Sequence, residues 1–333
     1  MINFEGPEKR IFLSFIPIDP TISPKSPKSD KLDKLDKSIR LIDKEKWEIL
    51  LSISKCHILN YVRHQDFDAY LLSESSLFVY DDFIILKTCG ITSPFKLIPQ
   101  LKEVCKEIGL EINSVFYCHR EFIYPEVQGF PHSNFNHEIN SLSELFPLLP
   151  HIQTINLNQW VGIIYGDIMK IRGYYEISMT NIKNSEFNVK SLSFLSSYDE
   201  YYFKPCGYSL NGQRDDRYYT LHVTPELECS YVSFEMNEGR RYLYSELIEI
   251  FKPENITIIE LLDNLEDNLL DNLGDLDDNL LSNSLDNSLD NLLSNLLGTW
   301  EGGGRYSVRR SEEIKMMDKL SLRINILGIK NTI

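Results

Sequence analysis

A serine hydroxyl, a cysteine thiol and a histidine imidazole of this 333-residue sequence are candidates for nucleophilic or acid–base chemistry. A thiol whose pKa lies near the working pH can both hold and give a proton, which as general acid catalysis contributes about 10²–10⁴-fold. Taken alone, Ser75 indicates a hydroxyl at a strand end, and Cys89 indicates a buried thiol, the commoner fate of a cysteine. His222 is likewise more often a satisfied structural residue.

Two apolar runs must position Ser75 and Cys89. The runs Tyr70–Tyr80 and Phe83–Cys89 flank the pair Asp81-Asp82. This pattern predicts a tight β-hairpin that carries Ser75 on its first strand and Cys89 at the end of its second.

Helix and strand signals surround this hairpin. One helix is predicted to begin after its cap Asp43, a second to begin at Ser93-Pro94 and stop at Gly109, and a third to cover Asn134–Phe146. Many strands joined by short turns, with few helices, favour an antiparallel α+β fold over a doubly wound parallel one. The further predicted strands are Cys56–Val62, Glu111–Cys118, Trp160–Tyr165, Tyr174–Met179, Tyr218–Val223, Ser230–Glu235 and Ile256–Ile259.

Four separated segments resemble, in the same order, motifs of the eukaryotic S-adenosylmethionine decarboxylases. The first resembles the family's N-terminal substrate-binding segment, the second its self-cleaving serine motif, the third its second active-site loop and the fourth its processing strands. Four matches in one order are hard to produce by chance. The segments are Phe4–Lys9, Tyr70–Gly90, Phe203–Gly212 and Leu221–Glu226 with Ser230–Glu235.

The resemblance implies a fold, a cofactor and a reaction. The fold would be an α/β/β/α sandwich of two antiparallel sheets flanked by helices, in a single domain over residues 1–333. Cleavage between Glu74 and Ser75 would give a beta chain, 1–74, and an alpha chain, 75–333, whose first residue is a pyruvoyl group made from Ser75. The enzyme would decarboxylate S-adenosylmethionine to the aminopropyl donor for spermidine and spermine. No metal is implied.

The resemblance also assigns roles in processing and catalysis. Ser75 Oγ would attack the Glu74 carbonyl, and His222 would then remove the Ser75 α-proton, while the Ser209 hydroxyl assists the rearrangement. Cys89 would protonate the decarboxylated substrate. The chain has no evident Gly-rich cradle for the phosphate of pyridoxal phosphate, the usual cofactor of such reactions.

The substrate's groups define a second set of expected residues. Adenine is bound by aromatic faces, each stack contributing roughly 1–3 kcal/mol, and a sulfonium cation gains from an aromatic face or a carboxylate. By resemblance, Phe4 and Phe203 would stack on the adenine and Glu226 would accept from the ribose hydroxyls. Glu5 and Glu8 would line the site around the pyruvoyl group, Glu8 as a catalytic residue, and Glu5 and Glu74 would bind the substrate.

Charge and composition limit the partners. The formal net charge of −15, from 34 Lys and Arg against 49 Asp and Glu, argues against nucleic-acid binding, because no basic stripe could neutralise phosphates. The sequence has no run of about 18 apolar residues that could cross a membrane and no signal peptide, so we expect a soluble, cytoplasmic protein. The six cysteines show neither CxxC spacing nor a secreted context, which predicts reduced thiols.

Two low-complexity insertions are predicted, at 21–38 and 263–298. The first, rich in Ser-Pro-Lys and Asp-Lys-Leu, cannot bury enough apolar surface to offset its ordering entropy and is expected to be a loop. The second repeats Asp-Asn-Leu-Leu units and holds eight Asp and one Glu, leaving −6 for the other residues. Frayed helix or disorder is expected there, with no role in catalysis.

Two other classes of function compete with this interpretation. A catalytically dead member of the same family, acting as regulatory partner of an active paralogue, would be expected to lack the processing serine or the catalytic thiol, and both are present. A purely structural acidic protein would not explain the four matched segments. The resemblance leaves open whether the chain forms a homodimer, because relatives differ.

Overall fold

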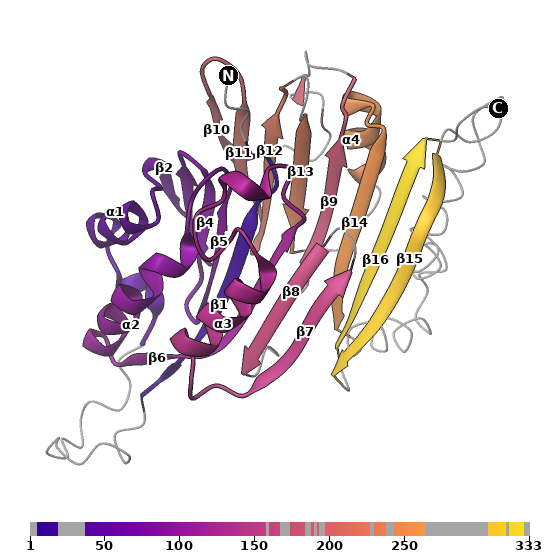
Figure 1. The fold of residues 1–333 in the computed structure, drawn as a ribbon. Helices are drawn as coiled ribbons and strands as arrows, with labels where there is room; N and C mark the ends of the chain where they lie inside the picture. Colours follow the sequence, from indigo (N-terminus) through magenta and orange to yellow (C-terminus); the bar gives the residue numbers. More distant parts are fainter. Residues whose placement is uncertain are drawn as a thin grey trace, which may run out of the picture. The chain divides into compact units, whose positions relative to one another are not determined.

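The computed structural model describes residues 5–18, 37–157, 160–166, 174–183, 188–189, 192, 197–226, 230–237, 243–263, 306–317 and 320–329. The chain divides into two compact units, Glu5–Lys170 and Ile171–Ile333 with Met1–Phe4. Each unit contains one eight-stranded sheet whose neighbouring strands are antiparallel (Figure 1). The predicted α+β class with two antiparallel sheets is therefore confirmed.

The N-terminal unit, Glu5–Lys170, has the strand order β2-β3-β4-β5-β1-β6-β8-β7. Its strands are β1 Lys9–Pro17, β2 Ile58–Arg63, β3 Asp68–Leu72, β4 Ser75–Val79, β5 Phe83–Thr88, β6 Leu110–Arg120, β7 His151–Leu157 and β8 Trp160–Gly166. Its helices are η1 Ile39–Leu41, α1 Lys44–Ile53, η2 Pro94–Leu97, α2 Ile98–Glu107, η3 Pro125–Val127 and α3 Phe135–Leu145.

Helices α1, α2 and α3 bury their apolar sides in one core with residues of this sheet. Trp47, Leu50 and Leu51 of α1 belong to the same buried cluster as Leu101 of α2 and Leu142 of α3. Burying a side chain of this size stabilises the fold by about 1.5–3 kcal/mol, so this core holds the sheet in place.

Two of the three predicted helices begin as the sequence predicts. The Asp43 side chain accepts from the Lys46 N–H at the start of α1, and Asn134 accepts from the Asn136 N–H at the start of α3. The third begins differently, because Ser93 takes the N-cap position but its side chain makes no capping hydrogen bond. A 3₁₀ turn, η2, precedes α2, and the Ser93 hydroxyl contacts His132 Nε2 at 3.2 Å rather than capping the helix.

The predicted hairpin is confirmed at Asp81-Asp82, where the Tyr80 N–H bonds to the Phe83 carbonyl at 2.9 Å. The expectation of one strand over Tyr70–Tyr80 is wrong, because that run folds as β3 and β4. Leu72 pairs with Ser75, so Ser73-Glu74 is a two-residue turn between them. Strands β3, β4 and β5 thus form two consecutive hairpins, which place Glu74, just before Ser75, next to Cys89, just after Thr88.

The second unit has the strand order β10-β11-β12-β13-β9-β14-β16-β15. The apolar side of helix α4 shares a core with residues of β9 and β11–β14. The hairpin of β15 and β16 and the strands β1, β7, β10 and β11 were not predicted. The elements are β9 Tyr174–Thr180, β10 Ser197–Tyr202, β11 Tyr208–Arg214, β12 Arg217–Thr224, β13 Tyr231–Met236, α4 Leu243–Phe251, β14 Asn255–Asp263, β15 Tyr306–Met317 and β16 Leu320–Ile329.

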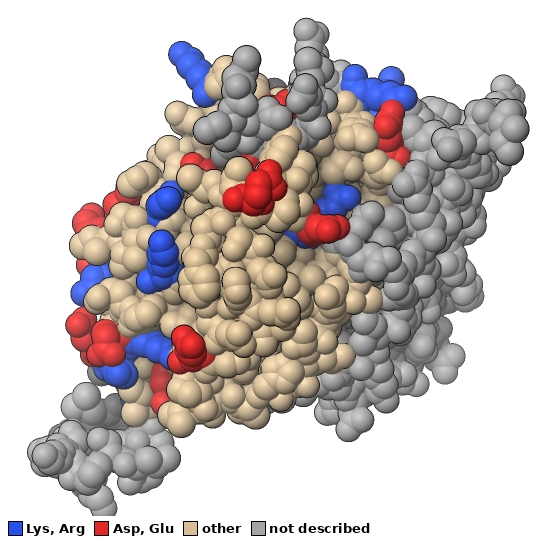
Figure 2. Space-filling model, in the orientation of Figure 1, with Lys and Arg blue, Asp and Glu red and all other residues tan. Residues whose placement is uncertain are grey.

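Most of both low-complexity insertions lies outside the described residues. Ser38, at the end of the first, accepts from the Arg40 N–H and caps η1, and Asp263 ends β14. Each helix of the described part is too short or too polar to span a bilayer. On the face drawn in Figure 2, Lys and Arg residues stand among Asp and Glu residues rather than in a stripe of one sign.

Candidate functional site

Ser75 occupies an unusual backbone conformation directly after the Ser73-Glu74 turn. Its φ is 131°, a value that side chains with a Cβ rarely adopt. Such a residue costs of order 1–3 kcal/mol and persists where the surrounding structure enforces it. The register enforces it here, because Ser75 pairs with Leu72 on one side and Thr88 on the other. The peptide bond between Glu74 and Ser75 is therefore held in a strained turn.

The Ser75 hydroxyl is bound by a buried carboxylate. Ser75 Oγ donates to Glu8 Oε1 at 2.8 Å, and Lys87 Nζ lies 3.2 Å from Glu8 Oε2. Glu8 precedes β1, which pairs with β5 through Lys9 and Thr88, so the strand order brings Glu8 beside Ser75 across β5. The ion pair with Lys87 favours the ionised carboxylate, which is the form that can accept the serine proton.

The carbonyl of Glu74 is held by two donors from one residue. The Cys89 backbone N–H bonds to this oxygen at 2.8 Å, and Cys89 Sγ lies 3.2 Å from it. Burial raises the pKa of the Cys89 thiol well above its usual value, so at neutral pH the sulfur carries its proton and donates. Two donors on one carbonyl oxygen are the arrangement that stabilises a developing oxyanion.

Two other predicted carboxylates of this unit lie near the turn. Glu74 Oε2 is 4.0 Å from Cys89 Sγ, and burial raises the pKa of Glu74 to about 7. The Glu5 carboxylate binds the backbone, accepting hydrogen bonds from the N–H groups of Ile123 and Tyr124 at 2.9 and 2.7 Å. Burial raises the pKa of Glu5 as well.

In the second unit, the structure brings Ser209 and His222 together. They are direct partners in the β11–β12 register, and Ser209 Oγ lies 2.7 Å from His222 Nδ1. Thr220 Oγ1 donates to Asn211 Oδ1 at 2.9 Å and therefore accepts from His222 Nε2 at 2.8 Å. This network assigns the ring proton to Nε2, which leaves Nδ1 as the basic nitrogen that accepts from Ser209.

The predicted substrate residues of the second unit are accessible. Phe203 is half-buried, its N–H bonds to the Gly207 carbonyl at 2.9 Å, and its ring meets Tyr201 edge-on at 4.9 Å between centroids. Glu226 is half-buried two residues after β12. Phe4 lies outside the described residues.

Comparison with known proteins identifies the family of the chain. The family model described as adenosylmethionine decarboxylase matches residues 1–162 and 168–289. The chain belongs to the adenosylmethionine decarboxylase family. Among relatives of this family, an S-adenosylmethionine decarboxylase proenzyme of Dictyostelium discoideum is 33% identical over an alignment of 283 residues that covers 77% of this chain and 73% of the relative. Proenzyme 4 of Arabidopsis thaliana is 32% identical over 300 residues, covering 77% of this chain and 84% of the relative.

A solved structure shows the same fold. The monomer of Trypanosoma brucei AdoMetDC-delta26 superposes with a TM-score of 0.51 at 17% sequence identity, over 77% of this chain and 99% of that one. At this identity the likeness supports the family's fold alone.

Some residues of the site were not predicted from the sequence. Thr220, which sets the His222 tautomer, has no sequence signal beyond its place two residues earlier on the same strand face. Lys9 lies within the matched N-terminal segment, but nothing in that segment indicates its contacts. The buried group Tyr117, His119, His132 and Glu138 was missed entirely, although two histidines near a glutamate are a weak signal for a polar cluster.

Proposed function

We propose that this chain is a pyruvoyl-dependent S-adenosylmethionine decarboxylase that makes its cofactor from Ser75 by cleaving its own Glu74–Ser75 bond. The observation that supports this most is the strained turn in which the Ser75 hydroxyl meets Glu8 and the Glu74 carbonyl meets both Cys89 donors. The proposal includes a cytoplasmic location and an aminopropyl product used for spermidine and spermine. Release of labelled CO₂ from carboxyl-labelled S-adenosylmethionine by the purified protein tests the activity.

The first step of cleavage follows from the contacts of the N-terminal unit. Ser75 Oγ attacks the Glu74 carbonyl carbon while Glu8 takes the hydroxyl proton. The carbonyl oxygen becomes an oxyanion between the N–H and S–H of Cys89. The carbon–nitrogen bond then breaks, the Ser75 nitrogen takes a proton, and an ester joins Glu74 to Ser75 Oγ. Release of the strained φ of Ser75 favours this step.

The second step is assigned to His222. Removal of the Ser75 α-proton drives β-elimination, in which the bond between Ser75 Cβ and Oγ breaks; this frees the Glu74 carboxylate and leaves dehydroalanine at position 75. Water then replaces the nitrogen, ammonia leaves, and a pyruvoyl group remains. His222 suits the role of base because its Nδ1 carries a lone pair, which accepts a hydrogen bond from the Ser209 hydroxyl in this structure.

His222→Ala is expected to halt processing between these steps. The ester should form, because its groups lie in the N-terminal unit, and then persist because no base removes the α-proton. Hydroxylamine, which cuts esters at neutral pH, should split this variant at residue 75. Thr220→Val serves as the matched control, since it should slow the second step by roughly 10-fold through loss of the tautomer-setting contact without stopping it. Rapid conversion of His222→Ala to a pyruvoyl terminus would contradict the assignment.

The pyruvoyl group supplies an electron sink for loss of the substrate carboxylate. The chain's own residues bind the substrate and move the proton. We assign Phe4 and Phe203 to the adenine, Glu226 to the ribose hydroxyls, and Glu5, Glu8 and Glu74 to the surroundings of residue 75. Cys89 is assigned the proton that replaces the carboxylate, and its high pKa keeps that proton on sulfur until it is needed.

The alternative of a catalytically dead regulatory paralogue predicts a chain that stays intact. The contacts of Ser75 with Glu8 and of Cys89 with the Glu74 carbonyl would have no use in such a protein. These contacts favour the active enzyme.

Putrescine is expected to activate this enzyme weakly or not at all. By resemblance, activated relatives bind the diamine in a buried acidic pocket in the region of Lys87, Glu176 and Glu235, with an acid at the position of Phe12. Phe12 is instead buried and stacks on Phe116 at 5.6 Å between centroids. An apolar pair offers no partner for an ammonium beyond a ring face.

Arg172, which by resemblance stands where activated relatives carry a second acid, lies outside the described residues. A guanidinium there would repel the diamine and supply its positive charge in cis. Cleavage and decarboxylation rates with and without millimolar putrescine measure the effect. A several-fold stimulation by putrescine would overturn the substitution argument.

A further inference from the structure

The Cys89–Gly90 turn is fixed through its backbone. The Cys89 N–H bonds to the Glu74 carbonyl at 2.8 Å, and the Cys89 carbonyl accepts from Thr92 Oγ1 at 2.8 Å. The Gly90 N–H bonds to the Glu5 carbonyl at 3.0 Å. Gly90 has a φ of 61°, a conformation that glycine adopts without strain. The direction of the Cys89 thiol thus depends on the bonds that hold this turn.

The carbonyl of Gly90 is bound by a charged side chain. Lys9 is fully buried, and its ammonium donates to Gly90 O and to Gln128 Oε1, both at 2.9 Å. The same ammonium lies 5.0 Å from the centre of the Phe122 ring. A lysine held by two acceptors and a ring face has little freedom to turn, and charged donors make stronger bonds than neutral ones.

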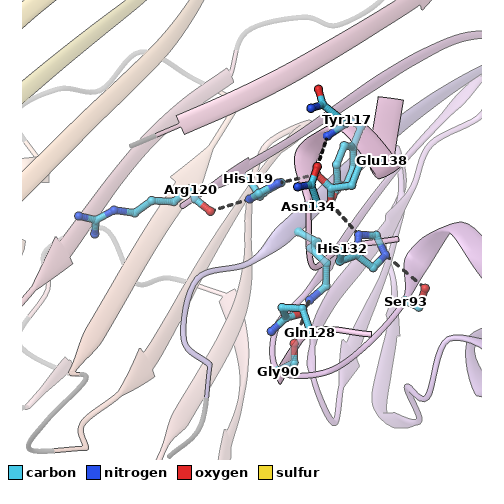
Figure 3. Close-up of polar contacts among 11 residues, drawn as sticks. Gly90, Ser93, Tyr117, His119, Arg120, Gln128, His132, Asn134 and Glu138 are labelled. Carbon is cyan, nitrogen blue, oxygen red and sulfur yellow. Dashed lines mark hydrogen bonds and ion pairs between the residues drawn. The ribbon is translucent and has the colours of Figure 1, made fainter. Parts of the chain in front are cut away.

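The segment that carries Gln128 is itself anchored by a buried carboxylate (Figure 3). Glu138 Oε1 accepts from the Tyr117 hydroxyl at 2.6 Å and from His132 Nδ1 at 2.7 Å, and Glu138 Oε2 lies 2.9 Å from His119 Nε2. Burial raises the pKa of Glu138, but the contacts with His119 and His132 outweigh burial and lower this pKa to about 2. His119 Nδ1 lies 2.6 Å from the Arg120 carbonyl, so both nitrogens of this ring contact acceptors.

The surroundings keep Lys9 charged at neutral pH. Burial lowers the pKa of Lys9 to about 8, and the negative charges of Glu138 and Glu5 oppose this shift. The ammonium therefore persists below pH 8 and is lost above it.

We propose that Lys9 is a positioning residue for self-cleavage, holding the Cys89–Gly90 turn so that both Cys89 donors stay on the Glu74 carbonyl. The inference rests on the proposed self-cleavage and adds a residue to it. Lys9 does not touch the reacting atoms in this arrangement; it acts through Gly90. Loss of its bond frees one side of the turn and weakens the stabilisation of the oxyanion that forms at Glu74.

Two variants of Lys9 separate its contributions, and a second lysine supplies the control. Lys9→Met removes charge and donor, whereas Lys9→Gln keeps a neutral donor of similar length. Lys102 also donates to a backbone carbonyl, that of Leu145, and lies 4.3 Å from the Phe146 ring centre, far along the chain from the turn. Lys102→Met thus removes the same kinds of contact elsewhere in the unit.

The rate constant of self-cleavage is measured on freshly purified full-length chain by intact mass. We expect Lys9→Met to slow cleavage roughly 10–100-fold, which is the range for removing an outer partner of a reactive group. The cleavage rate of Lys9→Gln should lie between those of Lys9→Met and the wild type. The cleavage rate of Lys102→Met should match that of the wild type. Melting curves identify any variant that does not fold. If Lys9→Met does not fold, Lys9→Gln still decides the test.

The dependence of the cleavage rate on pH separates positioning from a general packing role. In the wild type and in Lys102→Met, the rate should fall as the pH rises through about 8, because Lys9 loses its charge there. The pKa of Glu74 is about 7, which is lower than that of Lys9, and the pKa of the Cys89 thiol is well above its ordinary value. Lys9→Gln should lack the fall near pH 8.

The outcomes distinguish the two proposals. If the wild type cleaves and Lys9→Met and Lys9→Gln cleave at the same rate with the same pH profile, the role of Lys9 is wrong and the proposed function stands. If the wild type does not cleave, both proposals are wrong.

Discussion

Ser75→Ala is expected to leave the protein as one uncut chain of 38.8 kDa with no decarboxylase activity. Alanine has no hydroxyl to attack the Glu74 carbonyl, so neither the ester nor the pyruvoyl group can form. The loss should be complete, because no other group replaces the nucleophile and the cofactor precursor together. Denaturing electrophoresis and intact mass measure the cleavage, and a CO₂-release assay measures the activity.

Ser76→Ala is the matched control for this variant. Ser76 is also a fully buried serine of β4, but alternate residues of a strand point to opposite faces, so its hydroxyl is directed away from that of Ser75. Cleavage of Ser76→Ala should proceed to completion. A Ser75→Ala chain that still splits at Glu74, or a Ser76→Ala chain that stays intact, would show that the nucleophile is misassigned.

Cys89→Ala is expected to lose turnover far more than it loses cleavage. The variant keeps the Cys89 N–H, one of the two donors on the Glu74 carbonyl, so cleavage should slow by roughly 10-fold and still finish. Turnover loses its proton donor, and removal of a general acid costs about 10²–10⁴-fold, or about 3–5 kcal/mol. The kcat is measured on variant protein that has first been left to cleave fully.

Cys105→Ala controls for the loss of a buried thiol. Cys105 is a residue of α2 in the hydrophobic core of the N-terminal unit, and burial alone raises the pKa of its thiol to about 12. This variant should lose some thermal stability and keep its kcat. If fully cleaved Cys89→Ala decarboxylates at the wild-type rate, the assignment of Cys89 as proton donor is wrong.

The sequence predicted the elements whose ends are set by a cap or a turn within a few residues. The Asp43 cap fixes α1, and the Asp81-Asp82 turn fixes the β4–β5 hairpin, because in each case the decisive hydrogen bond joins residues a few positions apart. The five cysteines that the structure describes are not joined in disulfides, and Cys229 lies outside the described residues.

Non-local pairing decided what the sequence alone could not predict. The contact of Glu8 with Ser75 spans 67 positions and that of Lys9 with Gly90 spans 81, and both depend on β1 lying beside β5. The turn at Ser73-Glu74 lies inside an apolar run with no Gly or Pro, so the usual turn signal is missing. Family resemblance located Ser75, but the geometry of its turn comes from the register of three strands.

The β15–β16 hairpin had a signal that was overlooked. Leu320, Leu322, Ile324 and Ile326 alternate with Ser321, Arg323 and Asn325, which is the period of a half-buried strand. In contrast, the edge strand β10 has the sequence Ser-Tyr-Asp-Glu-Tyr-Tyr and exposes much of both faces, so its hydropathy gives no strand period.

Intact mass and N-terminal analysis of the purified wild-type protein test the central claim most directly. The account predicts two fragments, separated between Glu74 and Ser75. The larger should be lighter than a serine-terminated chain by the mass of ammonia and blocked to Edman degradation by its pyruvoyl group. A single uncut chain with full decarboxylase activity, or a larger fragment that begins with a free serine, would contradict the account.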